Sequence, residues 1–359
     1  MLAVVPDLTE FSATLDELAA QDEFTGSVLV TAGDDRLLAA AYGYANRAYR
    51  APCTLDTRFD TASVTKLFTA VAVLQQIERG AFTLDTSAIG YLGLTGTAIS
   101  PDVTAYHLLT HTSGIADDAD ELDDERFEDL FIDDPTYRFT EAEHHLPHFV
   151  TKPPRFTPGQ DCRYCNAGYI LLGLMVERAT GGSYRDYVRA NVFDRAGMTR
   201  SAFLRMDIVE PDVAEGVEPI RDDDGTVTGW RRNIFSYPPI GDPAGGAYTT
   251  VGDLTTFHRA LVESRLLGPE LTAAMLVPYA QAEGYLPNGY GLEFRTDAEG
   301  RVRYYEKEGG NFGVSALLRH YPGDTPGHGI TVAMLAVGED TIRSPVRLLD
   351  EAMRRSLEV

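Results

Sequence analysis

The patterns that predict β-strands lie at the two ends of this chain, and the residues between them read mainly as helices. Two short apolar runs at 27–31 and 37–42, joined by Gly33-Asp34-Asp35, are typical of a β-hairpin. Four further strand-like runs separated by turn residues follow near the C-terminus, at 290–295, 302–307, 314–321 and 330–337. This layout predicts a split domain in which the two distant groups of strands share one antiparallel sheet.

Helical periodicity fills the rest of the chain. Apolar residues spaced as on one helix face predict a first helix at 8–18 and another at 62–79 that Gly80 ends. Further helices are predicted near 103–110, 168–180, 183–192, 250–264 and 343–356. We therefore expect an α+β fold, with residues 1–90 and 251–359 in a discontinuous domain whose sheet is covered by the terminal helices. Residues 91–250 are expected to form a mainly helical lobe, with a cleft between the two.

Composition and charge limit the partners of such a fold. The 359 residues are 44% hydrophobic, which is ample for a large core. A net charge of −23 opposes nucleic acids and anionic membranes as partners, because both are polyanions. No apolar run approaches the length of a membrane span. The N-terminus lacks the basic start of a signal peptide, which favours a cytoplasmic protein, although an exported protein whose leader is removed fits as well.

Much of the negative charge is local. Residues 117–134 contain eleven acidic residues and one basic residue, Arg126. Such a run is typical of a solvated, mobile segment. The alternative is a lid that repels anionic substrates or attracts cationic ones.

Ser63 and Lys66 open the predicted helix at 62–79 in the pattern Ser-x-x-Lys. Positions i and i+3 share one helix face, so the hydroxyl and the amine are neighbours. The positive end of the helix favours an anionic oxygen and disfavours a protonated lysine, which helps the amine act as a base. Only three of the 31 basic residues are lysines, and a lysine can lose its proton whereas an arginine cannot. Taken alone, the pattern also fits a capping serine beside a surface lysine.

Two other short motifs are individually weak. Tyr164-Cys165-Asn166 precedes an apolar helix, and its asparagine fits a helix cap. Lys307-Glu308-Gly309-Gly310 ends a predicted strand, where glycines let a backbone or ligand approach closely, although a charged hairpin end fits equally.

Together, in this order, the motifs Ser-x-x-Lys, Tyr-x-Asn and Lys-x-Gly resemble those of the penicillin-recognising serine hydrolases. The similarity is to the branch that contains class C β-lactamases, D-aminopeptidases and family VIII esterases. Matching context surrounds the motifs in RFDTASVTKLFTA, TAYHLLTHTSGI, YCNAGYILLGLMVERATG, GMTRSAF and PAGGAYTTVGDLTTF. The resemblance runs from about residue 25 to about residue 340 and implies a β-lactamase/transpeptidase-like fold. It implies a serine hydrolase that cleaves an amide or ester of a small molecule or short peptide.

The resemblance also implies a role for each matching residue. Ser63 would be the nucleophile, and Lys66 and Tyr164 would share the role of base. Asn166 and Lys307 would hold Lys66, Tyr164 or the substrate. The backbone N–H groups of Ser63 and Gly310 would form the oxyanion hole beside Gly309. No metal or cofactor is implied. A catalytically weak penicillin-binding or sensor protein of the same fold is the alternative.

Several residues depart from this pattern or compete with it. Glu308 occupies a position that is often threonine, and it would repel a substrate carboxylate if its side chain faces the cleft. That would favour amine-bearing or neutral substrates over penicillins. His144 and His148 could bind zinc on one helix face, but Pro147 lies between them. His107 and His111 also share a face and are interpreted as structural. The lone pair Cys162 and Cys165 is too few for a four-ligand zinc site.

Overall fold

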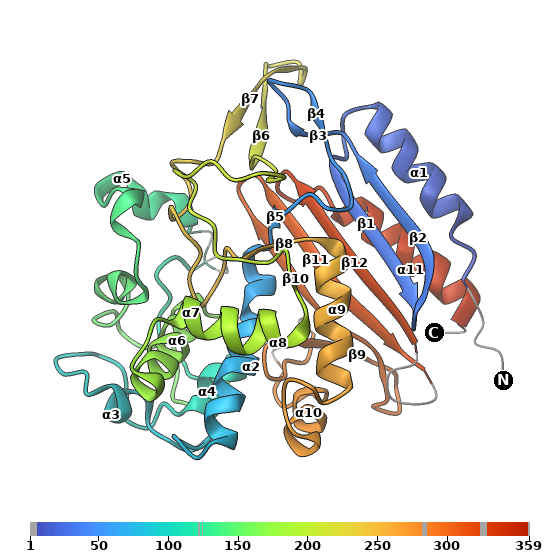
Figure 1. Ribbon diagram of the computed structural model, residues 1–359. Helices are drawn as coiled ribbons and strands as arrows, with labels where there is room; N and C mark the ends of the chain where they lie inside the picture. The colour runs from blue at the N-terminus through green and yellow to red at the C-terminus, as the bar shows by residue number, and fades with distance from the viewer. Residues whose placement is uncertain (1–5, 121–122, 124, 282–285, 324–328, 358–359) are drawn as a thin grey trace.

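The computed structural model describes residues 6–120, 123, 125–281, 286–323 and 329–357 (Figure 1). Its centre is a six-stranded antiparallel sheet in the order β2-β1-β12-β11-β10-β9. The strands are β1 (Gly26–Ala32), β2 (Asp35–Tyr42), β9 (Glu293–Thr296), β10 (Val302–Asn311), β11 (Val314–Pro322) and β12 (Gly329–Val337). The N-terminal hairpin joins the C-terminal strands through β1 and β12, where Ser27 lies opposite Leu335. The predicted shared sheet is confirmed.

The terminal helices cover one face of this sheet. α1 (Thr9–Ala20) and α11 (Arg343–Leu357) lie against each other on that face (Figure 1). Phe11 and Leu15 of α1 are buried with Val28 and Val30 of β1 in one apolar cluster. Successive residues of a strand point to opposite faces, so Leu29 belongs to the core on the other side.

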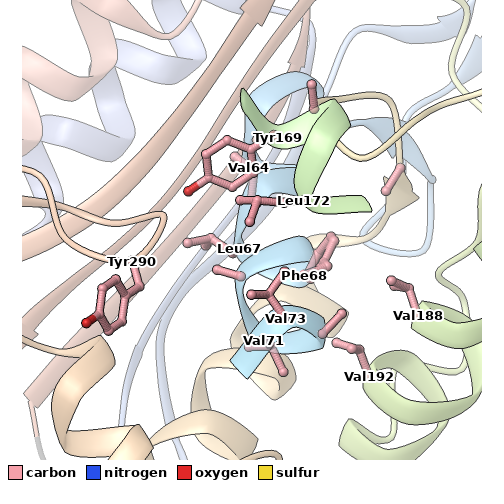
Figure 2. Packing of buried hydrophobic residues seen from close by; sticks show 14 of the residues in the cluster. Val64, Leu67, Phe68, Val71, Val73, Tyr169, Leu172, Val188, Val192 and Tyr290 are labelled. Atoms are coloured by element: carbon pink, nitrogen blue, oxygen red, sulfur yellow. The ribbon is translucent and has the colours of Figure 1, made fainter. Parts of the chain in front are cut away.

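The second face of the sheet meets α9 (Val251–Val262) and the helical part of the chain. A short 3₁₀ turn, η1 (Ala62–Val64), leads into α2 (Thr65–Glu78), which lies in the middle of the larger core (Figure 2). Most residues of α2 are buried. A helix that is apolar on most faces must be surrounded by other elements. Phe68 illustrates this, since its ring makes edge contacts with Phe193 at 5.0 Å and Phe257 at 4.9 Å.

The helical part contains further helices, of which α6 and α7 pack on α2. These further helices are α3 (Ala88–Leu92), α4 (Ala105–Leu109), α5 (Leu130–Asp133), α6 (Asn166–Thr180), α7 (Tyr184–Val188), α8 (Asp194–Ala196) and α10 (Pro269–Met275). Short 3₁₀ segments lie at η3 (Phe127–Asp129), η4 (Thr136–Arg138) and η5 (Ala142–His148), and a π-helical turn, η6 (Arg189–Phe193), joins α7 to α8. α6 packs on α2, which places the start of α6 near the start of α2. No helix among the described residues is long and apolar enough to cross a bilayer.

The region 91–250 also contains β-structure that the sequence patterns did not predict. β6 (Val217–Arg221) and β7 (Val227–Arg232) form a hairpin, and their residues are mostly exposed or half-buried. The strands lack apolar alternation because neither face is fully covered. Two further strand pairs are very short and involve residues before this region: β3 (Tyr44–Asn46) pairs with β4 (Ala51–Pro52), and β5 (Phe59–Asp60) pairs with β8 (Tyr248–Thr249). The α+β class is confirmed, and the domain boundaries stay a prediction.

Replacing Phe68 by alanine tests the dependence of the fold on α2. The substitution removes a ring that two other aromatic rings enclose, and we expect it to lower the free energy of unfolding by about 3–5 kcal/mol. Urea unfolding followed by circular dichroism measures this. Phe235→Ala is the matched control, because Phe235 is 78% exposed and should change stability by less than about 0.5 kcal/mol. Equal losses from both substitutions would contradict the central position of α2.

Candidate active site

The turn that carries Ser63 is held in an unusual conformation. Ala62 has a positive φ of 41°, which L-residues rarely adopt. Its N–H donates to Oδ1 of Asp60 at 2.7 Å, and this bond fixes the turn. Burial raises the pKa of Asp60 to about 7 against the opposing effect of the Ala62 N–H group. Ser63 belongs to η1, just before α2, where it is half-buried and lines a pocket.

Lys66 is fully buried one turn further along. Its Nζ lies 3.0 Å from Oγ of Ser63, as the i, i+3 spacing predicts. The same nitrogen donates to Oδ1 of Asn166 and to the carbonyl oxygen of Ala244, both at 2.7 Å. The three contacts come from three separate segments, so the position of Lys66 depends on the tertiary structure.

Tyr164 completes the contact with the serine. Its Oη lies 2.6 Å from Oγ of Ser63, and either oxygen can be the donor. Two lysine amines lie close to its ring: Nζ of Lys66 is 4.9 Å and Nζ of Lys307 is 4.8 Å from the ring centre. Both lysines therefore reach the phenol that contacts the serine oxygen.

Lys307 and the following glycines approach from β10. Lys307 is buried, and its Nζ donates to Oε1 of Glu293 at 2.6 Å. At Gly309 an added Cβ atom would lie 2.2 Å from the carbonyl oxygen of Thr61 and 2.9 Å from the backbone nitrogen of Ser63. Only glycine therefore allows β10 to lie this close to the serine turn. Gly310 lines the same pocket as Ser63.

The structure thus brings all seven predicted residues to one place, although their chemical roles stay predictions. Further residues that the sequence did not reveal as part of this site line the same pocket. Asp118, His145 and Asp242 line it together with Ser63 and Gly310. No short motif marks them, because they come from three segments that only the fold assembles.

The acidic run 117–134 begins inside the protein. Asp117 accepts the N–H groups of Asn166 at 2.7 Å and Ala167 at 2.8 Å, and so fixes the start of α6. Burial and the charge of Asp118 raise the pKa of Asp117 well above its usual range. The interpretation of this run as a solvated segment is therefore wrong at its start, where Asp117, Asp118 and Asp120 are all buried.

Ion pairs explain why Asp120 can be buried. Arg163 donates to both of its carboxylate oxygens, at 3.0 and 2.7 Å, and Arg155 lies 3.0 Å away. A buried carboxylate requires such partners. Residues 121, 122 and 124 lie outside the described part of the chain, and the idea of a lid stays a prediction.

Glu308 does not face the catalytic residues. Alternate residues of a strand point to opposite faces, and Glu308 lies on the face of β10 opposite to Lys307. Its Oε1 is 3.9 Å from Arg319, which also pairs with Glu306 and with Asp350 of α11. The condition under which Glu308 would repel a substrate carboxylate is therefore not met, and this argument against penicillins falls.

The histidines separate into different structural roles. Nδ1 of His107 caps α4 together with Thr104, and His144 accepts the backbone N–H of Glu141 at 3.2 Å. Nε2 of His148 lies 3.3 Å from Oδ2 of Asp134, so the two histidines have different partners. No group of three or more histidine, cysteine or acidic side chains among the described residues is arranged to hold a metal ion at this pair.

The sequence predicts a structural role for His111, and the structure places its ring against Tyr164. Its ring lies 4.7 Å from the ring of Tyr164, and its Nδ1 accepts the N–H of Cys165 at 3.1 Å. Burial, with the charges of Lys307 and Lys66, holds the pKa of His111 well below its usual range. A neutral His111 therefore packs against the phenol without adding a third positive charge.

A family model described as Beta-lactamase matches residues 11–352. The chain therefore belongs to the β-lactamase family, and the resemblance seen in its motifs is confirmed. It is an enzyme of the serine hydrolase class.

Individual relatives support this assignment. The crystal structure of a penicillin-binding protein from Bacillus halodurans is 35% identical with a TM-score of 0.86, over 94% of this chain and 99% of that chain. Penicillin-binding protein 4 of Amycolatopsis lactamdurans is 27% identical over 92% of this chain and 86% of its own length. Esterase EstB of Burkholderia gladioli is 33% identical over 54% of this chain and 50% of its own length.

Replacing Gly309 by alanine tests the close approach of β10 to the serine turn. We expect at least a tenfold loss of kcat/KM on a chromogenic ester, because the added methyl group must displace backbone atoms at Ser63. Release of the chromogenic product measures kcat/KM, and circular dichroism shows whether the variant is folded. Gly182→Ala is the matched control, since a Cβ atom there meets nothing within 4 Å. An active, correctly folded Gly309→Ala variant would show that the approach has no role in activity.

Proposed function

We propose that this chain hydrolyses an amide or ester bond of a small molecule or short peptide through an acyl-enzyme on Ser63. The observation that carries the proposal is the contact of one serine oxygen with two proton acceptors. Oγ of Ser63 lies 2.6 Å from Oη of Tyr164 and 3.0 Å from Nζ of Lys66. A serine hydroxyl becomes an effective nucleophile when a positioned base accepts its proton.

The hydrogen bonds of Lys66 support its role as a base. The carbonyl oxygens of Asn166 and Ala244 can only accept, so each takes one N–H of the amine. A neutral amine then directs its lone pair at Ser63, whereas an ammonium directs its third N–H there. The same geometry therefore serves both protonation states, as a group that takes and returns a proton requires.

Tyr164 is placed to pass a proton onward. It contacts the serine oxygen directly, and the amines of Lys66 and Lys307 lie 4.9 and 4.8 Å from its ring centre. In the proposed cycle, the serine proton moves to Lys66 or Tyr164 as Oγ attacks the carbonyl carbon. The phenol then donates a proton to the departing amine or alcohol. A water molecule repeats the sequence to release the acid and restore Ser63.

The negative oxygen of the tetrahedral intermediate needs preorganised donors. We assign this role to the backbone N–H groups of Ser63 and Gly310, which line one pocket. The absence of a side chain at Gly309 allows β10 to lie against the serine turn, and this close approach supports the assignment. Asn166 borders the pocket as well, where it can contact a substrate amide.

Intact-mass analysis tests the proposal directly. The protein is mixed with p-nitrophenyl acetate, a D-alanine anilide and benzylpenicillin, and we expect one acyl group per chain from at least one of them. Ser63→Ala should form no adduct, whereas Ser100→Ala, at a half-buried loop serine, should react as the wild type does. A folded wild-type protein with no adduct and no turnover would contradict the proposal. An adduct that never hydrolyses would instead favour a penicillin-binding or sensor protein.

Replacing Lys66 by arginine tests the assignment of the base. Arginine keeps the positive charge but cannot be deprotonated, so we expect the acylation rate to fall by about 10²–10⁴-fold. Stopped-flow release of p-nitrophenol measures this rate. Arg189→Lys is the matched control for an exchange of these two residue types, since Arg189 is exposed, pairs with Asp186 at the surface and should change the rate less than about threefold. A rate near wild type in Lys66→Arg would assign the base role to Tyr164 alone.

A further inference from the structure

His145 lies between two buried carboxylates beside the nucleophile. It belongs to η5, is 1% exposed, and comes from a different segment than either carboxylate. Its Nδ1 is 3.5 Å from Oδ2 of Asp118, and its Nε2 is 3.3 Å from Oδ2 of Asp242. All three residues line the same pocket as Ser63. At these distances neither ring nitrogen forms a well-aligned hydrogen bond among the described residues, so the two carboxylates contact it as charged neighbours.

Asp242 fixes one of the two carbonyl groups that hold Lys66. Its Oδ1 accepts the N–H groups of Ala244 at 2.7 Å and Gly245 at 3.1 Å. This turn directs the carbonyl oxygen of Ala244 toward Nζ of Lys66. One oxygen of Asp242 therefore shapes the loop, while the other faces His145.

Asp118 is adjacent to the residue that fixes the second carbonyl group. Asp117 accepts the N–H groups of Asn166 and Ala167, and so orients Asn166, whose Oδ1 accepts from Lys66. Asp118 faces His145 from the next position in the chain. His145 thus connects the two segments that present both carbonyl acceptors of Lys66.

The charges around His145 favour its protonated form. Burial alone disfavours the imidazolium, but the contact with Asp118 and the charges of Asp242 and Asp118 outweigh it and raise the pKa of His145; Arg185 opposes this weakly. The other close group is the ring of Phe139, which carries no charge. An imidazolium has an N–H for each carboxylate, whereas a neutral ring turns a lone pair toward one of them.

We propose that His145 is a positioning residue for acylation, which ties the Asp117-Asp118 segment to the 242–245 loop and so holds both carbonyl acceptors of Lys66 in place. This proposal rests on the proposed function of Ser63 and Lys66. His145 itself contacts no reacting atom. Its imidazolium acts through the two carboxylates, and loss of its proton loosens the link.

The sign of the pH effect follows from the raised pKa. The link is fully present below the pKa of histidine in an unfolded chain, about 6.5, and is lost as the pH rises through the higher pKa of His145 in the folded state. Activity should therefore show an alkaline decline that belongs to His145. Removing one carboxylate lowers the pKa of His145 and moves that decline to lower pH.

Three variants test this in the full-length protein with p-nitrophenyl acetate between pH 5 and 10. His145→Gln should lower kcat at least tenfold, leave KM within about twofold and lack the alkaline decline. Asp242→Asn keeps an oxygen for the Ala244 and Gly245 amides but not the charge, and it should shift the decline to lower pH. His148→Gln is the matched control, since His148 lies in the same 3₁₀ segment, pairs with Asp134 and should behave as the wild type does.

The pH profile separates positioning from general stability, because partial unfolding lowers the amplitude of the activity without moving the decline. An alkaline decline that is unchanged in both His145→Gln and Asp242→Asn would overturn the proposal. If His145→Gln does not fold, the profile of Asp242→Asn decides in the same way. A wild-type protein that forms no acyl-enzyme would remove the proposed function together with this one, whereas an active wild type with unaffected variants removes only the role of His145.

Discussion

The active site depends on a lysine amine held without exposure to water. Burying a charged group costs free energy unless hydrogen bonds replace its hydration. At Lys66 the replacement comes from the carbonyl oxygens of Asn166 and Ala244, each 2.7 Å away. Because both belong to segments far from Lys66 in the chain, the fold must place α6 and the loop before β8 at the start of α2. The contact of Lys66 with Ser63 follows from that arrangement.

The main sheet contributes to the site because the backbone of β10 packs closely against the turn that carries Ser63. The glycine at 309 lets β10 lie against the serine turn, where a methyl group would meet the backbone at 2.2 Å. Nζ of Lys307, from the same strand, lies 4.8 Å from the ring centre of Tyr164. A helix and a strand therefore hold the amines of Lys66 and Lys307 near the phenol of Tyr164. Such fixed positions are what acid–base catalysis requires.

Several expectations from sequence failed for one shared physical reason. The charge pattern predicted a solvated run at 117–134. In the structure, however, the buried Asp117 accepts a backbone N–H group at the start of α6, and the buried Asp120 pairs with Arg163. The charge of Glu308 predicted repulsion in the cleft, yet the alternation of β10 turns it toward Arg319. Local composition reports the cost of burying a charge but not the partners that offset it. Those partners are distant in sequence, and so are the side chains that pack against each face of a strand.

The sequence by itself determined where the main helices and strands lie and which residues are candidates for the chemistry. Apolar periodicity located most of the long helices and the six strands of the main sheet, and the order of three short motifs identified Ser63, Lys66, Tyr164, Asn166 and Lys307 (Figure 1). Those features are local, since helical spacing alone brings Ser63 to Lys66. Only the tertiary structure decided the surroundings of the amine, from Asp117 behind Asn166 to His145 between Asp118 and Asp242. Such contacts join separate segments, and no pattern within one segment encodes them.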